Sequence, residues 1–140
     1  MTENKKENLN NRMIKFLFEA APVRGACVQM AEEWQEMIKF HHYPENVAAL
    51  LGQFTAGALL LSSTIKFEGS LILQVKGSGP IAFIYAEVRN PMSVRAMAEI
   101  REGAEIKPEM DLQELINKDG KGLCALILDP KDRRPGVQPY

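Results

Sequence analysis

The side chains of this 140-residue chain that could do redox or metal chemistry are its two cysteines, Cys27 and Cys124. A closed zinc site needs four thiolate or imidazole ligands, which often come in pairs such as Cys-x-x-Cys. No such pair occurs in the sequence. Each cysteine lies within an apolar segment, so we expect both to be small buried hydrophobes without a redox role. They predict no metal site.

Histidines and carboxylates offer no catalytic arrangement either. His41 and His42 are adjacent, and neighbouring helix positions point about 100° apart, so the two cannot easily share a metal. Glu32 and Glu33 lie near a predicted helix start, where the helix dipole favours negative charge. No serine lies in a Gly-x-Ser-x-Gly elbow. We therefore predict no catalytic, cofactor-binding or metal-ligating residues and no enzymatic activity.

The segment Gly77-Ser78-Gly79-Pro80 resembles a phosphate loop in composition. A phosphate cradle, however, needs its glycine turn to lead into the N-terminus of a helix. Here the flanking residues alternate as strands do, and proline removes a backbone donor. A tight hairpin turn is the better interpretation.

The elements around that turn give the strongest structural signal. No charged residue occurs from Asn46 to Ile65, after Pro44, a residue well placed to open a helix. Apolar residues follow helical spacing within this run, at Val47, Leu50, Leu51, Phe54, Ala58, Leu61 and Ile65. The period then changes to that of a strand over Leu71–Val75, and Ile81–Tyr85 reads as the returning strand. A long core helix leading into a hairpin is predicted.

The remaining elements are shorter. We predict helices over Arg12–Phe18, Ala31–His41 and Pro108–Asn117, the last with Leu112, Leu115 and Ile116 facing inward. Strands are predicted over 23–29, 94–101 and 123–128, and a loop over 131–140. Met13, Met37 and Met97 fit core-facing stripes. The fold class is α+β, a mixed, mostly antiparallel sheet of four to five strands with a long buried central helix and two to three shorter helices.

Bulk composition excludes several classes. Apolar residues make up 46% and charged residues 25%, with a net charge of −1, the balance of a soluble globular protein without a nucleic-acid footprint. The polar N-terminus lacks the apolar region of a secretory signal. The uncharged run is long enough to span a bilayer. Its polar residues and the character of the rest of the chain favour a buried helix, so no membrane partner is expected.

Four motifs occur in a characteristic order and spacing: Val23-Arg24-Gly25, His42-Tyr43-Pro44, Thr64-Ile65-Lys66-Phe67-x-Gly69 and Leu73-Gln74-Val75-x-Gly77-x-Gly79-Pro80. From about Phe16 to Tyr140 the sequence resembles the heat shock protein 33 family of redox-regulated holdase chaperones. Members of that family are about twice this length and end in a domain with four zinc-binding cysteines, which this sequence lacks. The polar residues 1–11 are predicted to form a flexible tail. The resemblance implies that residues 12–140 are the N-terminal part of the family's folding domain.

The resemblance implies a function as well. It is that of a cytoplasmic, ATP-independent chaperone, which binds unfolded client proteins and prevents their aggregation. Zinc would belong only to the absent C-terminal domain, so the redox switch would be missing from this chain. A homodimer or other self-association is expected, because the strand at 123–128 would lose a downstream neighbour. Two alternatives stay open. The chain could be a small ligand-binding or enzymatic α+β domain, or a structural dimerisation module without client binding.

Overall fold

The structure is a computed structural model that describes residues 11–89 and 93–131. Residues 1–10 of the predicted flexible tail and residues 132–140 of the predicted loop lie outside this description. Asn11, at the end of that tail, is held in place because its side-chain oxygen accepts a hydrogen bond from the Ala31 N–H at 3.0 Å.

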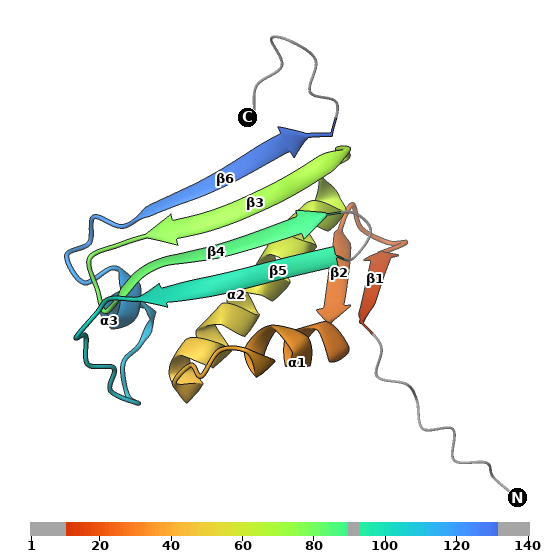
Figure 1. Ribbon diagram of the computed structural model, residues 1–140. Helices are drawn as coiled ribbons and strands as arrows, with labels where there is room; N and C mark the ends of the chain where they lie inside the picture. Colours follow the sequence, from red (N-terminus) through yellow and green to blue (C-terminus); the bar gives the residue numbers. More distant parts are fainter. Residues whose placement is uncertain (1–10, 90–92, 132–140) are drawn as a thin grey trace, which may run out of the picture.

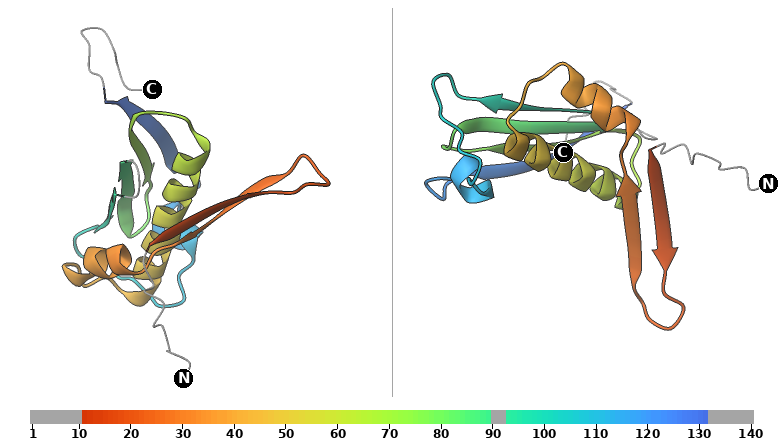
Figure 2. Two further views of the ribbon diagram at one scale, coloured as in Figure 1. Left: turned by 90° about the vertical axis from the view of Figure 1, so that its right-hand side faces the viewer. Right: turned by 90° about the horizontal axis from the view of Figure 1, so that it is seen from below.

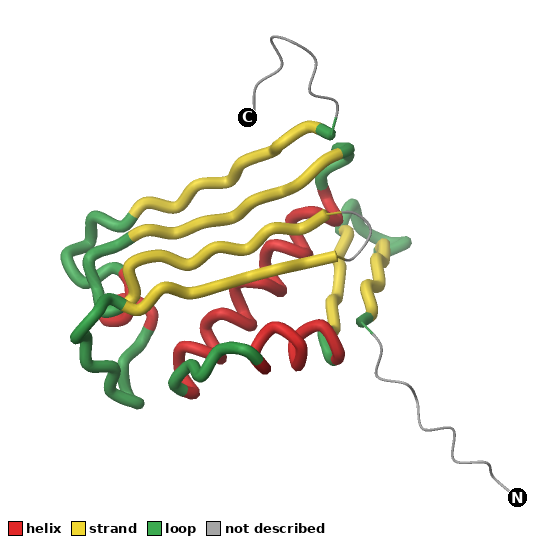
Figure 3. The backbone as a smooth tube through the Cα atoms, viewed as in Figure 1, coloured by secondary structure: helices red, strands yellow, loops and turns green. Residues whose placement is uncertain are grey.

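A four-stranded antiparallel sheet forms the platform of the fold (Figure 1). Its strands lie in the order β5-β4-β3-β6. They are β3 (Gly69–Lys76), β4 (Ile81–Arg89), β5 (Ser93–Ile100) and β6 (Leu123–Pro130). The long helix α2 (Glu45–Thr64) crosses one face of this sheet, and the tube drawing in Figure 3 shows the same two layers. The predicted α+β class is confirmed.

The core lies between α2 and the sheet in two clusters. The first surrounds the N-terminal half of α2 and comprises Val47, Leu51, Ile81, Ile84, Ala98, Leu115 and Ile116. The second surrounds its C-terminal half and comprises Ala58, Leu59, Leu71, Ala86 and Val88. Phe54 packs against both clusters and joins them.

By length and composition alone, α2 could also cross a membrane. Its packing favours the core interpretation, because Val47, Leu51, Ala58 and Leu59 are buried against the sheet. The one buried hydroxyl of the helix, on Thr55, donates to the Leu51 carbonyl at 2.6 Å. Burial thus leaves no unsatisfied polar group at that point.

The first predicted helix was wrong. Residues Arg12–Leu17 form strand β1, which pairs antiparallel with β2 (Arg24–Gln29) in a separate two-stranded sheet. Residues 18–23 close the hairpin, and the Phe18 N–H donates to the Val23 carbonyl at 2.9 Å. We call residues 12–29 the arm. It projects away from the body of the molecule (Figure 2).

Two short helices complete the fold. Helix α1 (Glu32–Lys39) confirms the predicted second helix, and its Trp34 packs against the first core cluster. Helix α3 (Leu112–Ile116) is shorter than predicted, since it begins only after Asp111, whose carboxylate accepts from the Glu114 N–H at 2.9 Å.

Two inward-facing residues were predicted wrongly. Leu112 of α3 is exposed although helix spacing places it on the same face as the buried Leu115 and Ile116, since it is the first residue of the helix, at the end of that face. Met97 is exposed as well. It lies opposite Tyr85 in the register of β5 and β4, on the face of the sheet that α2 does not cover. Met13 and Met37 are half-buried, and Met13 packs against the second cluster.

The turn at 77–80 joins β3 to β4, as predicted, and holds α3 in place. The Gly79 N–H donates to the Ile116 carbonyl at 3.4 Å, and the Arg101 guanidinium donates to the Gly79 carbonyl at 2.9 Å. A Cβ atom on Gly77 would overlap the carbonyl oxygen of Ile116. Glycine is therefore needed here for the close approach of two backbones.

Candidate functional site

Among the residues that the structure describes, the arm carries the largest group of exposed apolar side chains. Leu17 is 78% exposed, and Ile14, Phe16, Phe18 and Val23 are each at least 41% exposed. Such a grouping is unusual, because soluble proteins rarely leave large contiguous apolar surface facing water unless it binds something.

Pairing within the arm decides which side chains share a face. Lys15 lies opposite Ala26, and Leu17 lies opposite Arg24, so these four form one face. Phe16 lies opposite Gly25 on the other face, where its ring covers the glycine and packs edge-on against Phe18 with ring centres 5.8 Å apart. An aromatic ring over a strand glycine replaces the missing side-chain contacts.

The base of the arm is anchored, whereas its tip is not. Met13 and Val28, a cross-strand pair, pack against the second core cluster. Beyond them, an isolated two-stranded hairpin gains little stability of its own in water. The tip is thus an apolar surface attached to a rigid body and free to receive a partner.

A groove of about 690 Å³ separates the arm from the C-terminal half of α2. Its apolar wall includes Leu17 and Ala26 from the arm and Leu60 from the helix. Ser63 and Thr64 line the end of the groove, where their hydroxyls are already bonded to the Leu60 and Leu61 carbonyls at 2.7 and 2.9 Å. The wall of the helix is therefore less polar than its sequence suggests.

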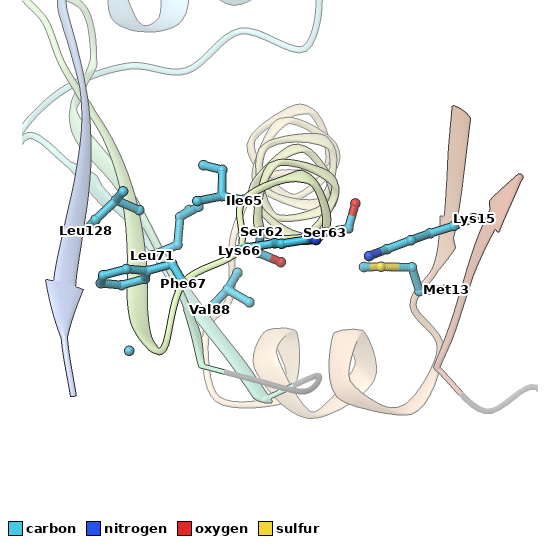
Figure 4. A pocket seen from close by; sticks show the side chains of 11 residues that line it. Met13, Lys15, Ser62, Ser63, Ile65, Lys66, Phe67, Leu71, Val88 and Leu128 are labelled. Carbon is cyan, nitrogen blue, oxygen red and sulfur yellow. The ribbon is translucent and has the colours of Figure 1, made fainter. Parts of the chain in front are cut away.

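A second hollow, of about 290 Å³, continues the groove toward β3 and β6 (Figure 4). Lys15, Ser63 and Lys66 line both spaces, so the two are continuous. Met13 and Lys15 point from the arm toward the end of α2. The other residues that line this hollow are Ser62, Ile65, Phe67, Gly69, Leu71, Val88 and Leu128, so apolar and polar groups both face it.

The sequence matches a known protein family. A family model described as Hsp33 protein matches residues 11–140. The chain belongs to the Hsp33 family. It is similar to the 33 kDa chaperonin of Neisseria gonorrhoeae strain NCCP11945, at 39% identity over 127 residues, and to that of Aliivibrio salmonicida, at 38% over 123 residues. The 33 kDa chaperonin of Shewanella woodyi is 35% identical over 127 residues.

These Hsp33 relatives are much longer than the matched region. The alignments cover 88–91% of this chain but only 40–41% of each relative. The chain thus spans about two-fifths of the length of the curated relatives it matches. The region that the family model matches contains the arm, the long helix and the four-stranded sheet of this chain.

The described residues do not fit the zinc that the Hsp33 resemblance implies elsewhere in the family. No group of three or more His, Cys, Asp or Glu residues within 11–89 and 93–131 could hold a metal ion. Cys27 lies in the arm, and Cys124 lies in β6 of the other sheet. His41 stacks on the Tyr43 ring, with ring centres 5.2 Å apart.

The predicted burial of the cysteines was wrong, since both are exposed. Cys27 lies opposite Ile14 on an uncovered face of the arm. Cys124 belongs to an edge strand. An apolar strand thus buries its side chains only where another layer covers it, which the sequence of the strand does not show.

One carboxylate that sequence reasoning missed lies on the face of the sheet opposite α2. Glu87 is 4% exposed and accepts from Arg89 at 2.9 Å and from Arg95 at 2.7 Å. Tyr85 adds a third hydrogen bond at 3.0 Å. Burial alone would raise the pKa of Glu87, but these donors and Ser70 lower it to about 2. The charged, saturated carboxylate is suited to holding β4 and β5 together.

Glu33, which lies at the predicted start of α1, is a second carboxylate whose pKa is shifted. Burial raises its pKa, and one of its carboxylate oxygens has no hydrogen-bond partner among the described residues. Its neighbour Glu32 is exposed, so the two do not form an acid–base pair.

Proposed function

We propose that this chain acts as an ATP-independent holdase, which binds unfolded polypeptide segments and keeps them from aggregating. The single observation that carries the proposal is the exposed apolar arm beside an apolar groove in a member of the Hsp33 family. Its relatives are named chaperonins, which supports a non-enzymatic role in the cytoplasm.

The physical basis is removal of apolar surface from water, at about 25 cal/mol per Å². A holdase must accept many sequences, which favours side chains that adapt to different partners. Leu17 and Phe18 are exposed, and the Phe16 ring that contacts Phe18 is exposed as well, so these side chains can follow the shape of a client. The groove then offers a second apolar wall on α2.

The experiment measures light scattering of a thermally unfolding client with the chain present under reducing conditions. The double variant L17S/F18S should lose much of the protection that the natural sequence gives. The matched control L112S/F40S makes the same changes at exposed residues of α3 and the end of α1, outside the groove, and should retain it. Equal loss in both variants would refute the arm as the binding surface, and no protection by the natural sequence would refute the holdase.

We also propose self-association through the edge strand β6. Leu123 is 67% exposed, Leu126 and Cys124 are exposed too, and no charged residue occurs from Leu123 to Leu128. The opposite edge, β5, carries Arg95 and Glu99, the kind of charge that protects an edge. Sedimentation of the L126K variant should show a smaller species than the natural sequence. A matching substitution in β5 at Ala98 is unsuitable as a control, because Ala98 is buried and a lysine there would disturb the core. An unchanged sedimentation coefficient for L126K would exclude β6 as the interface.

Redox control is a separate proposal. Since the described residues do not fit a zinc site, we propose that client binding by this chain does not depend on oxidation. Addition of peroxide to the light-scattering assay should leave the protection unchanged. A gain in protection that is reversed by a thiol reductant would show redox control by Cys27 or Cys124.

A further inference from the structure

The rim of the groove is positively charged. Lys15 and Arg24 extend from the arm and Lys66 from the opposite wall, directly after α2, and all three are exposed. No Asp or Glu is among the residues that line the groove or the hollow that continues it. The chain as a whole has a net charge of −1, so this concentration of cations does not follow from composition.

The arm itself is basic. It contains Arg12, Lys15 and Arg24 against one acidic residue, Glu19, which gives residues 12–29 a net charge of +2. Glu19 belongs to the turn at the tip, and Glu68, two residues after Lys66, lines a different hollow at the end of β3. Neither acidic side chain lines the groove.

The rim cations form no ion pair with any other residue that the structure describes. Among the described residues, the ion pairs join Lys39 to Glu36 and Arg89 and Arg95 to Glu87, and none involves Lys15, Arg24 or Lys66. Exposed cations that are not paired within the fold can pair with a bound molecule at no cost to the fold itself. Their placement around apolar walls makes the groove amphipathic.

We propose that this groove selects unfolded segments in which apolar residues alternate with aspartate or glutamate. The inference rests on the proposed holdase function and names the class of client that the same surface prefers. Apolar contacts supply the affinity, and complementary charge supplies the discrimination and faster association. The apolar walls argue for polypeptide over nucleic acid, since a phosphate backbone has no side chains to fill them.

The size of the preference follows from the exposure of the rim. An exposed ion pair contributes up to about fivefold in affinity, and salt screens it. Two or three such pairs should therefore favour an acidic over a basic client by roughly tenfold at low ionic strength. The preference should disappear at high ionic strength, whereas the apolar part of the binding should remain.

The test uses two fluorescent peptides with the same leucine and phenylalanine positions, one with glutamate and one with lysine at every other position. Anisotropy titrations with the full chain at about 50 mM and about 500 mM salt span the range over which surface charges become screened. The acidic peptide should bind roughly tenfold tighter at low salt. The variant K15E/K66E should reverse this order, and the matched control K76E/K121E, at exposed lysines outside the groove, should preserve it.

Three results would overturn the inference. Equal binding of both peptides would show a groove without charge selection, and the holdase proposal would survive. A preference that persists in K15E/K66E, folded by circular dichroism, would place the selection elsewhere on the molecule. If neither peptide binds the natural sequence, the groove is no client site, and the proposed function fails together with the inference.

Discussion

The body of the molecule buries its apolar side chains, whereas the arm leaves most of its apolar side chains exposed to solvent. In the body, α2 covers the sheet, so that Leu51 is 1% exposed and Val47, Ala58 and Leu59 are fully buried. In the arm, an equally apolar pair of strands has a covering layer only at its base. The difference teaches that apolar sequence builds stability where a second layer exists and a binding surface where it does not.

Truncation of apolar side chains in each region should give the largest difference in the free energy of unfolding. Leu51→Ala or Phe54→Ala should lower the free energy of unfolding by about 2–5 kcal/mol, since each leaves a cavity between α2 and the sheet. Leu17→Ala, at an exposed position of the arm, should change it by less than about 0.5 kcal/mol. Urea denaturation measures all three. Comparable losses in both regions would show that the arm is part of the cooperative core.

Glycine substitutions sharpen the same contrast. Gly77→Ala should cost about 2–4 kcal/mol, because its Cβ would meet the backbone of Ile116, which cannot move without displacing α3. Gly25→Ala in the arm would meet only the Phe16 ring, which can swing into solvent, and should cost less than about 1 kcal/mol. Thermal melts of the two variants give the comparison. A larger loss for Gly25→Ala would mean that Phe16 is locked in place.

Acid should weaken the body through Glu87. Its folded pKa of about 2 lies below the ordinary value of 4.5, so the carboxylate stabilises the fold above that value and this contribution is lost as pH falls toward 2. Glu87→Gln should therefore cost about 1–3 kcal/mol at neutral pH and progressively less in acid. Glu19→Gln, at an exposed carboxylate of the arm, is the control and should have little effect. A difference independent of pH would show that Glu87 acts through shape alone.

The smallest effect concerns the two thiols, one in each region. Metal analysis of the purified chain should give no stoichiometric zinc, since the described residues contain no suitable ligand group. Both cysteines are exposed, so a thiol reagent should modify them without denaturant. One tightly held zinc per chain would contradict the prediction and direct attention to His41, His42 and the thiols.

The helices and strands could be predicted from the sequence where the spacing of apolar residues fits only one type of secondary structure. The charge-free run of α2 and the alternation of β3 specified those elements, because only one regular structure places their apolar residues on a single face. In residues 12–17 the apolar positions fit a helix and a strand equally well, and pairing with β2 decided the outcome. A short segment cannot resolve that choice by itself.

The groove was harder to predict from the sequence than the fold. Lys15, Arg24 and Lys66 come together only because the arm folds beside the end of α2, and 50 residues lie between the first and the last. Exposure of Cys124 was equally hidden, because a strand at the edge of a sheet has the same composition as one at its centre. The four family motifs carried the functional prediction, whereas the residues of the surface required the structure.

The position of β3 in the sheet has a consequence for the order in which the chain assembles. One neighbour, β4, follows after a short turn, but the other, β6, pairs Cys124 with Val75 across 48 residues of intervening chain. Contacts that close long loops form late, so the β3–β4 hairpin should exist for a time with one open edge. During that interval the nascent protein displays unpaired backbone groups and apolar side chains, the features that a holdase captures in unfolded proteins. If the chain is the holdase proposed above, its own folding intermediate would be one of its clients, and the yield on refolding should fall as protein concentration rises.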